Sequence, residues 1–370
     1  MTKRKYISYL LNPLEFLLNP FEMLRTKKVL QVNPTVAPER TEAAPTRIFI
    51  YDYDASGIEE KLVTTVSECY QYIESPKVTW LNVDGLNKAE VESICNHFGI
   101  HYLITEDILS VGQRPKMDDI DGLLFCVLNM LYFNEKESAV ETEQISIVLG
   151  KNFVISFQED AHRDVFNPLR DRLRFGASKL RQSGPDFLFY ALIDMIVDNY
   201  YVVMEKLGEK IELLEEDIVR QANKRSLAKI NILRKEMIVL KRSIAPVREM
   251  VSGILRSDSE LIEEKTEKYF KDVYDHIVQA NDLAENYRDM IMNLQDLYLS
   301  NVNLKMNEVM KVMTIVTCLL APATVIGGIF GMNFEIIPLS HNRLGFFIAV
   351  GIMFIVPIWM VIIFRRRGWF

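Results

Sequence analysis

The chain has 370 residues, of which 49% are hydrophobic, and it carries a formal net charge of −7 at neutral pH. This length suggests two domains, or one domain joined to a membrane anchor. The acidic balance argues against a nucleic-acid partner, because nucleic-acid binders carry basic patches. The sequence contains neither a P-loop motif nor an HExxH motif, so we expect no nucleotide partner and no zinc-hydrolase activity.

Residues 1–46 are predicted to form an N-terminal extension and linker, because Asn12-Pro13 and Asn19-Pro20 each favour a turn. A folded domain is predicted for residues 47–184, where strands and helices alternate. The predicted strands are rich in β-branched and aromatic residues and cover 48–53, 77–83, 123–133, 144–149 and 153–157. The predicted helices are 87–98 and 165–180. This mixture indicates an α/β or α+β domain with a central sheet.

Residues 185–256 have an almost purely helical pattern, which predicts an antiparallel pair of helices at 187–221 and 226–256. A stalk helix is predicted next, over 257–311. Residues 254–320 contain no glycine or proline, and a continuous helix of that length would extend on the order of 100 Å. Apolar residues of the stalk recur at alternating steps of three and four, at Val273, Ile277, Ala280, Ala284, Tyr287, Ile291, Leu294 and Tyr298. This heptad pattern predicts a coiled coil that continues into the membrane.

A first membrane span is predicted over 312–333. Residues 312–330 carry no charge and are long enough to cross the ~30 Å hydrocarbon core of a bilayer. Small or weakly polar residues form a stripe along this helix, at Asn307, Met310, Thr314, Thr317, Ala321, Thr324, Gly328 and Gly331. Such a stripe fits either close helix packing or a helix that offers oxygen atoms to something polar. Met313 and Met310 would narrow the cytoplasmic part of such a polar path.

A loop over 334–343, a second span over 344–364 and a basic tail over 365–370 complete the chain. Pro357 predicts a kink in the second span. Positive charges flank the two spans on the outside of the hairpin, at Lys305, Lys311, Arg365, Arg366 and Arg367. The positive-inside bias therefore places both termini in the cytoplasm and the loop outside. Two spans cannot enclose a channel, so a pore would require several subunits.

NEVMKVMTIV leads into the first span, Gly331-Met332-Asn333 ends it within IFGMNFE, and a short loop, the second span and a basic cluster follow. In these features the membrane hairpin resembles the CorA family of divalent-cation channels. The resemblance implies a homopentamer in which the first span lines the axis and Gly331, Met332 and Asn333 form the selectivity filter. The stripe from Asn307 to Gly328, with Met313, would line the pore, and the three terminal arginines would form a basic ring.

The resemblance also implies a regulatory metal site between subunits. Glu106 and Asp107, in ITEDILSVGQRPK, and Asp272, in YFKDVYDH, match the acids of that site, and Asp194 or Asp198 would add a second ion. Carboxylates brought together repel each other unless a cation bridges them. Loss of that cation when internal Mg²⁺ is low would let the subunits separate and the gate widen.

We therefore expect an α+β protein with a cytosolic α/β/α sheet domain, a long stalk helix and a two-helix membrane hairpin. The expected function is uptake of Mg²⁺ through the inner (plasma) membrane, driven by the membrane potential, with Co²⁺ or Ni²⁺ as secondary ions. Mg²⁺ would be both the transported ion and the regulatory ion. The expected partners are membrane lipids and other copies of the chain. Neither an organic cofactor nor an enzymatic activity is expected. Two alternatives stay open: a related zinc transporter, and a membrane-anchored coiled-coil scaffold without transport.

Overall fold

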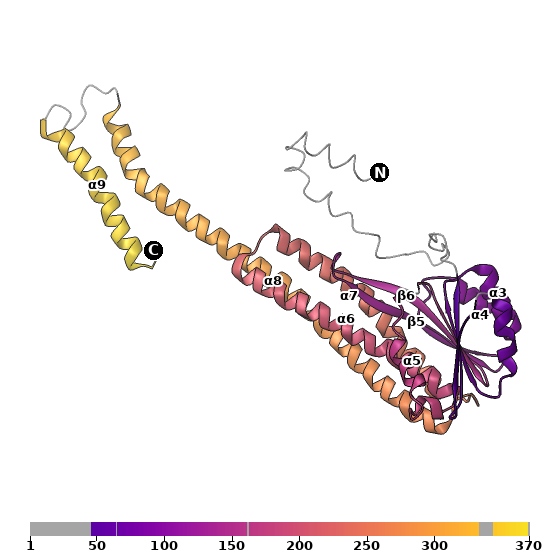
Figure 1. The fold of residues 1–370 in the computed structure, drawn as a ribbon. Coiled ribbons are helices and arrows are strands. Elements are labelled where there is room, and N and C mark those ends of the chain that lie inside the picture. The colour runs from indigo at the N-terminus through magenta and orange to yellow at the C-terminus, as the bar shows by residue number, and fades with distance from the viewer. Residues whose placement is uncertain (1–45, 64, 161–162, 333–342, 369–370) are drawn as a thin grey trace. The chain divides into compact units, whose positions relative to one another are not determined.

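The computed structural model of the protein describes residues 46–63, 65–160, 163–332 and 343–368 (Figure 1). The predicted extension therefore lies outside the described residues except for Thr46, and so do Asn333 and nearly all of the predicted loop. The chain divides into two compact units. The first contains the described residues up to Ile211 and residues 231–291, and the second contains residues 212–230 and the described residues from Met292 onward.

The first unit is built on a seven-stranded sheet with the order β2-β1-β3-β7-β6-β5-β4. Its strands are β1 (Arg47–Tyr53), β2 (Ile58–Val63), β3 (Val78–Asp84), β4 (Lys116–Ile120), β5 (Leu123–Asn134), β6 (Ala139–Leu149) and β7 (Phe153–Gln158). Only β3 and β7 pair in parallel among these strands. Asp121 and Gly122 join β4 to β5 with positive φ angles of 54° and 74°, as a two-residue hairpin turn requires.

Helices cover both faces of this sheet, so the α/β/α layering predicted from sequence is present (Figure 1). One face packs against η1 (Val66–Glu74), α3 (Lys88–His97) and α4 (Tyr102–Leu109) in a continuous apolar core. The other face packs against α5 (Asn167–Arg174) and α6 (Pro185–Gln221). On that face Trp80 meets Phe166 edge to face at 6.1 Å, and the Tyr200 hydroxyl donates to the Asn129 carbonyl at 2.8 Å.

The local sequence explains where several helices begin. Asn87 caps α3, because its side chain accepts hydrogen bonds from the amides of Ala89 and Glu90. The helix predicted over 165–180 is shorter in the structure: α5 begins with a proline in its first turn and ends at Arg174. None of β2, η1, α4 and β4 was predicted, and β6 begins five residues before the predicted strand.

The remaining helices are α7 (Lys224–Arg256), α8 (Glu264–Phe330) and α9 (Arg343–Arg366), with a short η3 (Leu180–Gln182) before α6. The long helix starts at Glu264 rather than at residue 257. Asp186, at the start of α6, accepts a hydrogen bond from the Glu263 amide at 3.2 Å and so satisfies one amide just before α8. From there α8 runs unbroken for 67 residues and through Pro322, which corresponds to about 100 Å of helix.

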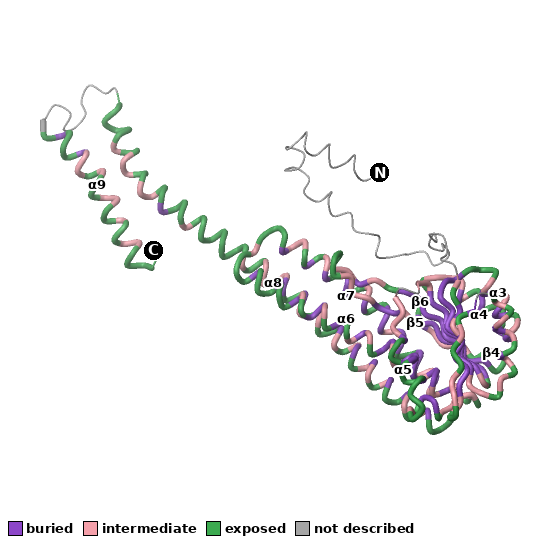
Figure 2. The backbone as a smooth tube through the Cα atoms, viewed as in Figure 1, coloured by how far each residue is buried: buried purple, intermediate pink, exposed green. Residues whose placement is uncertain are grey.

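Burial divides the described chain sharply (Figure 2). Buried residues are concentrated in the sheet and in the helices that cover it, whereas α9 and the last part of α8 are mostly exposed. Among the described residues, three helices are long and apolar enough to cross a membrane: α6, α8 and α9. In the apolar window of α6, 61% of the residues are buried, against 6% in α8 and in α9. We therefore assign α6 to the protein core and treat the apolar C-terminal part of α8, together with α9, as the candidate membrane spans.

Glu143 is a carboxylic acid buried inside the first unit. Its side chain accepts hydrogen bonds from the amides of Glu159 and Asp160, both at 2.8 Å, and from the Tyr132 hydroxyl at 3.1 Å. Burial raises its pKa to about 7, despite these hydrogen bonds. The folded protein thus holds a proton on Glu143 over a pH range in which the unfolded chain has released it.

We expect the folding stability to decrease as the pH rises from 5 to 8, because the folded state binds more protons than the unfolded state in this window. Glu143→Gln should remove about 3 kcal/mol of this pH dependence at most. The measurement is thermal melting of the wild type and the variant across that range. Glu135→Gln, at an exposed position, serves as the control. Parallel curves for wild type and Glu143→Gln would contradict the expectation.

Candidate metal centre and membrane helices

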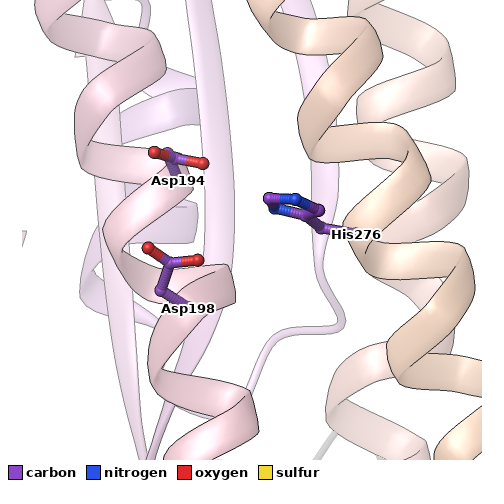
Figure 3. A group of neighbouring side chains, drawn as sticks. All are labelled: Asp194, Asp198 and His276. Atoms are coloured by element: carbon purple, nitrogen blue, oxygen red, sulfur yellow. The ribbon is translucent and has the colours of Figure 1, made fainter.

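Three side chains that can ligate a metal converge in the first unit (Figure 3). Asp194 and Asp198 lie one turn apart on α6, so they share a face of that helix, and His276 points toward them from α8. One ligand atom from each of the three lies within 4.8 Å of the other two. This geometry allows a single cation to contact all three residues.

The surroundings of the cluster hold its side chains in place. The Tyr190 hydroxyl donates to Asp194 at 3.1 Å, and the Tyr201 hydroxyl donates to the backbone carbonyl of His276 at 2.6 Å. Burial and the nearby charge of Asp198 raise the pKa of Asp194. The Nδ1 atom of His276 is buried and has no hydrogen-bond partner among the described residues. A cation at this position would compensate the carboxylates and could use a nitrogen that the described residues leave unsatisfied.

Asp272 extends the cluster along α8, one turn before His276. Its carboxylate is 65% exposed and lies 4.0 Å from Nε2 of His276, and its charge contributes to raising the pKa of Tyr190, after burial and the closer Asp194. The structure thus brings together three of the predicted aspartates. It adds His276, which sequence reasoning did not select, although its spacing of four residues from Asp272 places both on one face of a helix.

The donor set favours particular ions. Mg²⁺ prefers six oxygen ligands and keeps several of its waters, whereas an imidazole nitrogen suits Co²⁺, Ni²⁺ and Zn²⁺. Two carboxylates and one imidazole therefore make a site that can hold Mg²⁺ but should bind the transition metals more tightly.

We expect His276→Gln to weaken Co²⁺ binding to the purified protein by at least about tenfold, because loss of even an indirect metal partner has that effect. Mg²⁺ binding should change much less, since glutamine still offers an oxygen. Isothermal titration with each ion measures both effects. The control is His101→Asn, on α4, where asparagine can replace the histidine as the helix cap. Equal losses for both ions would argue against a specific role of the imidazole.

Glu106 and Asp107 lie elsewhere, on α4. The Asp107 carboxylate pairs with the Lys116 ammonium at 2.6 Å. Helix α4 packs on one face of the sheet, whereas α6 packs on the other, where Asn199 contacts Met130. The sheet therefore separates Asp107 from Asp194 within one chain. A site that joins Asp107 to the acids of α6 or α8 would need two copies of the chain.

The predicted stripe lies on an exposed face of α8 in the second unit. Buried or partly buried residues of the same segment occupy the other side of the helix, at Ile315, Cys318, Leu319, Pro322, Ala323 and Ile326. A methyl group placed on Gly327 would lie 3.8 Å from the Met353 methyl of α9. Helix α9 thus packs against α8 and leaves the stripe uncovered in the single chain.

Each threonine of the stripe has its hydroxyl oriented by its own helix. The hydroxyls of Thr314, Thr317 and Thr324 donate to carbonyls four residues earlier, at 2.8, 2.9 and 3.1 Å. Because each hydroxyl proton is donated to a backbone carbonyl of the same helix, the lone pairs of each hydroxyl oxygen remain available to accept a hydrogen bond. The exposed stripe therefore offers neutral acceptors, which suit the water shell of a cation.

The end of α8 explains the glycine that follows it. The Gly331 amide donates to the Gly327 carbonyl at 3.0 Å, and a side-chain carbon at Gly331 would lie 3.1 Å from that oxygen. That approach is tight, so a larger residue would disturb the turn. Met332 is exposed, and Arg365, Arg366 and Arg367 are exposed at the end of α9.

The family model described as "CorA-like Mg2+ transporter protein" matches residues 75–366. The cobalt/magnesium transport protein CorA of Thermotoga maritima is 38% identical over 323 residues, which cover 87% of this chain and 92% of that protein.

Solved structures share the fold. The complete structure of the CorA magnesium transporter from Methanocaldococcus jannaschii aligns with a TM-score of 0.73 at 23% identity, covering 87% of this chain and 98% of that one. The ZntB cytoplasmic domain from Vibrio parahaemolyticus aligns less well, with a TM-score of 0.56 at 16% identity over 70% of this chain and 99% of that one. At these identities the likeness concerns the fold alone.

Proposed function

The chain belongs to the CorA-like Mg²⁺ transporter family, as its resemblance predicted, and from this premise we propose that it forms a homopentameric channel for Mg²⁺ uptake. Co²⁺ and Ni²⁺ are the secondary ions of this proposal. Five copies of α8 surround the axis and α9 faces lipid. Both termini lie in the cytoplasm, and the hairpin spans the inner (plasma) membrane.

The exposed threonine stripe is the observation that carries this proposal. Its hydroxyl oxygens lie on the side of α8 that α9 leaves uncovered, and they are oriented as acceptors. Exposed hydroxyls on a lipid-facing surface would gain nothing, whereas around a water-filled axis they can contact hydrated ions. Met310 and Met313 are exposed on the same segment and would narrow the axis below them, with Asn307 as a further polar ring.

Neutral oxygens suit conduction of a divalent ion. Mg²⁺ releases its water reluctantly, and carboxylates in direct contact would hold it too tightly to leave. A filter made by Gly331, Met332 and Asn333 instead accepts hydrogen bonds from the water shell and binds weakly enough to release the ion. Movement of a divalent ion through 100 mV is worth about 4.6 kcal/mol, so the membrane potential suffices to drive uptake.

Regulation follows from the acids of the cytosolic unit. In the proposed pentamer Asp107 of one subunit and Asp272 of its neighbour share one Mg²⁺, with Glu106 nearby. Asp194, Asp198 and His276 hold a second ion within the subunit, which their arrangement supports. Occupied sites keep the subunits together and the channel closed. Falling internal Mg²⁺ empties the sites, and repulsion between the carboxylates then favours the open state.

The imidazole at the metal centre gives a specific reason to test zinc as well. His276 favours late transition metals at a regulatory position, and a zinc transporter of the same superfamily would also carry the glycine–asparagine motif. The stripe offers hydroxyl oxygens and no imidazole, so the proposed pore itself favours Mg²⁺.

Flux into liposomes tests the proposal. The purified protein is reconstituted, and Mg²⁺, Co²⁺, Ni²⁺ and Zn²⁺ are added separately outside vesicles with an inside-negative potential. We expect Mg²⁺ to enter, and entry to slow when the potential is removed. Zn²⁺ entry without Mg²⁺ entry would favour the zinc transporter. No flux of any ion would favour the membrane-anchored scaffold.

A further inference from the structure

Lys116 lies between two carboxylates. Its ammonium is 2.6 Å from Asp107 on α4 and 2.8 Å from Asp118, two residues further along β4. Residues two apart on a strand project from the same face, so Lys116 and Asp118 lie side by side and Asp107 faces both. The three side chains are all partly exposed, at 38%, 19% and 36% for Lys116, Asp107 and Asp118.

The backbone around Asp107 is anchored from β6. Gln144 is 3% exposed, and its side-chain oxygen accepts from the amides of Gly112 and Gln113 at 2.9 and 3.0 Å. Its nitrogen donates to the Asp107 carbonyl at 3.0 Å. A buried glutamine with these three hydrogen bonds fixes the end of α4 and the loop after it. Asp107 is therefore held in position, whereas the ammonium of Lys116 lies at the end of a long, flexible side chain.

We propose that Lys116 competes with the regulatory cation for Asp107, and that Asp118 retains the ammonium when the cation binds. This inference rests on the proposed function, in which Asp107 is a ligand. A carboxylate that is already paired with a lysine attracts a cation less strongly, so the cation must displace the ammonium. Asp118 makes that displacement possible, because Lys116 keeps a partner at 2.8 Å and moves only slightly.

This arrangement raises the cytosolic Mg²⁺ concentration at which the channel closes. A partly exposed ion pair changes an equilibrium by up to about fivefold, and the displaced lysine keeps half of its contacts. We therefore expect a two- to fivefold effect on the midpoint of Mg²⁺ inhibition. Loss of the Asp118 carboxylate should shift the midpoint of Mg²⁺ inhibition in the opposite direction, because Lys116 then has only Asp107 as a partner.

The test uses the full-length protein and two readouts, the inhibition of liposome flux by internal Mg²⁺ and the rise of the melting temperature with Mg²⁺. Lys116→Gln should lower both midpoints about two- to fivefold, and Asp118→Asn should raise them by a similar factor. Lys151→Gln is the matched control, since Lys151 is exposed and pairs with no carboxylate in the described part of the chain. It should leave both midpoints unchanged.

The outcomes separate this inference from the proposed function. Opposite shifts for the two variants support the competition. A wild-type protein that responds to Mg²⁺, with unshifted midpoints in both variants, overturns the role of Lys116 and leaves the regulatory site standing. A wild-type protein that does not respond to Mg²⁺ at all rejects the regulatory site and the competition together. If Lys116→Gln does not fold, an unshifted Asp118→Asn alone overturns the inference.

Discussion

Replacing Asn333 by alanine is expected to abolish Mg²⁺ flux while the protein still folds and assembles. In the proposed pentamer five carboxamides form one ring at the outer mouth. Each lost hydrogen bond to the hydrated ion is worth about 0.6–1 kcal/mol, so the ring of five as a whole contributes about 3–5 kcal/mol. A loss of that size at the narrow entrance slows flux at least ~100-fold. Initial rates in liposomes, at equal protein content, measure the change.

Two controls make this result specific. Asn293→Ala removes an exposed asparagine in the stalk part of α8 and should leave the flux near the wild-type rate. Gel filtration of both variants checks that assembly is unchanged. Asn333→Ala channels that still carried Mg²⁺ at the wild-type rate would contradict the assigned filter and would leave Gly331 with a purely structural role.

Much of the architecture could be predicted because its signals are local. The strands β1, β3, β5 and β7 combine β-branched and aromatic residues with turn formers at their ends, and Asn87 supplies a recognisable cap for α3. The long helix follows from the absence of glycine and proline up to Leu320. The two spans follow from their lack of charge. Each of these features depends on residues close together in the chain.

Two of the missed elements, β4 and α4, lacked a local signal of this kind. Strand β4 has the sequence KMDDI, whose charges obscure the usual strand pattern. The Asp121-Gly122 turn after it is a local hairpin signal that the sequence analysis did not use. Helix α4 spans eight residues, too few for a clear helical period. Because Lys116 lies on β4, its pairing with Asp107 could not be predicted either.

The metal centre shows where sequence reasoning ends. The spacing of Asp194 and Asp198 places both on one face of a helix, and the same holds for Asp272 and His276. Nothing local states that these two faces meet, since the packing of α6 against α8 decides it. The resemblance selected the aspartates, and the structure added the histidine, whose Nδ1 has no hydrogen-bond partner in the described part of the chain.

Asp272→Lys is expected to make the channel insensitive to internal Mg²⁺. The wild-type carboxylate is 65% exposed on α8, beside the acids of the metal centre, and in the proposal it shares a cation with Asp107 of a neighbour. Lysine reverses the charge at that point. It repels an incoming Mg²⁺, and it can pair with Asp194 or Asp198 of its own chain, so the ion that links two subunits is lost. We expect the Mg²⁺ concentration for half-inhibition to rise about 5- to 30-fold, as two lost charge contacts at about 0.5–1 kcal/mol each imply.

The measurement is liposome flux at a fixed external Mg²⁺ concentration while the internal concentration is varied. Asp282→Lys makes the same charge change at another exposed position of α8 and should keep the wild-type inhibition curve. A general effect of charge on the stalk would shift both variants equally, whereas loss of a bridging ion shifts only Asp272→Lys. A wild-type inhibition curve for Asp272→Lys, with flux intact, would mean that the cytosolic acids do not set the gate, and closure would then have to arise within the membrane span, at Met310 and Met313.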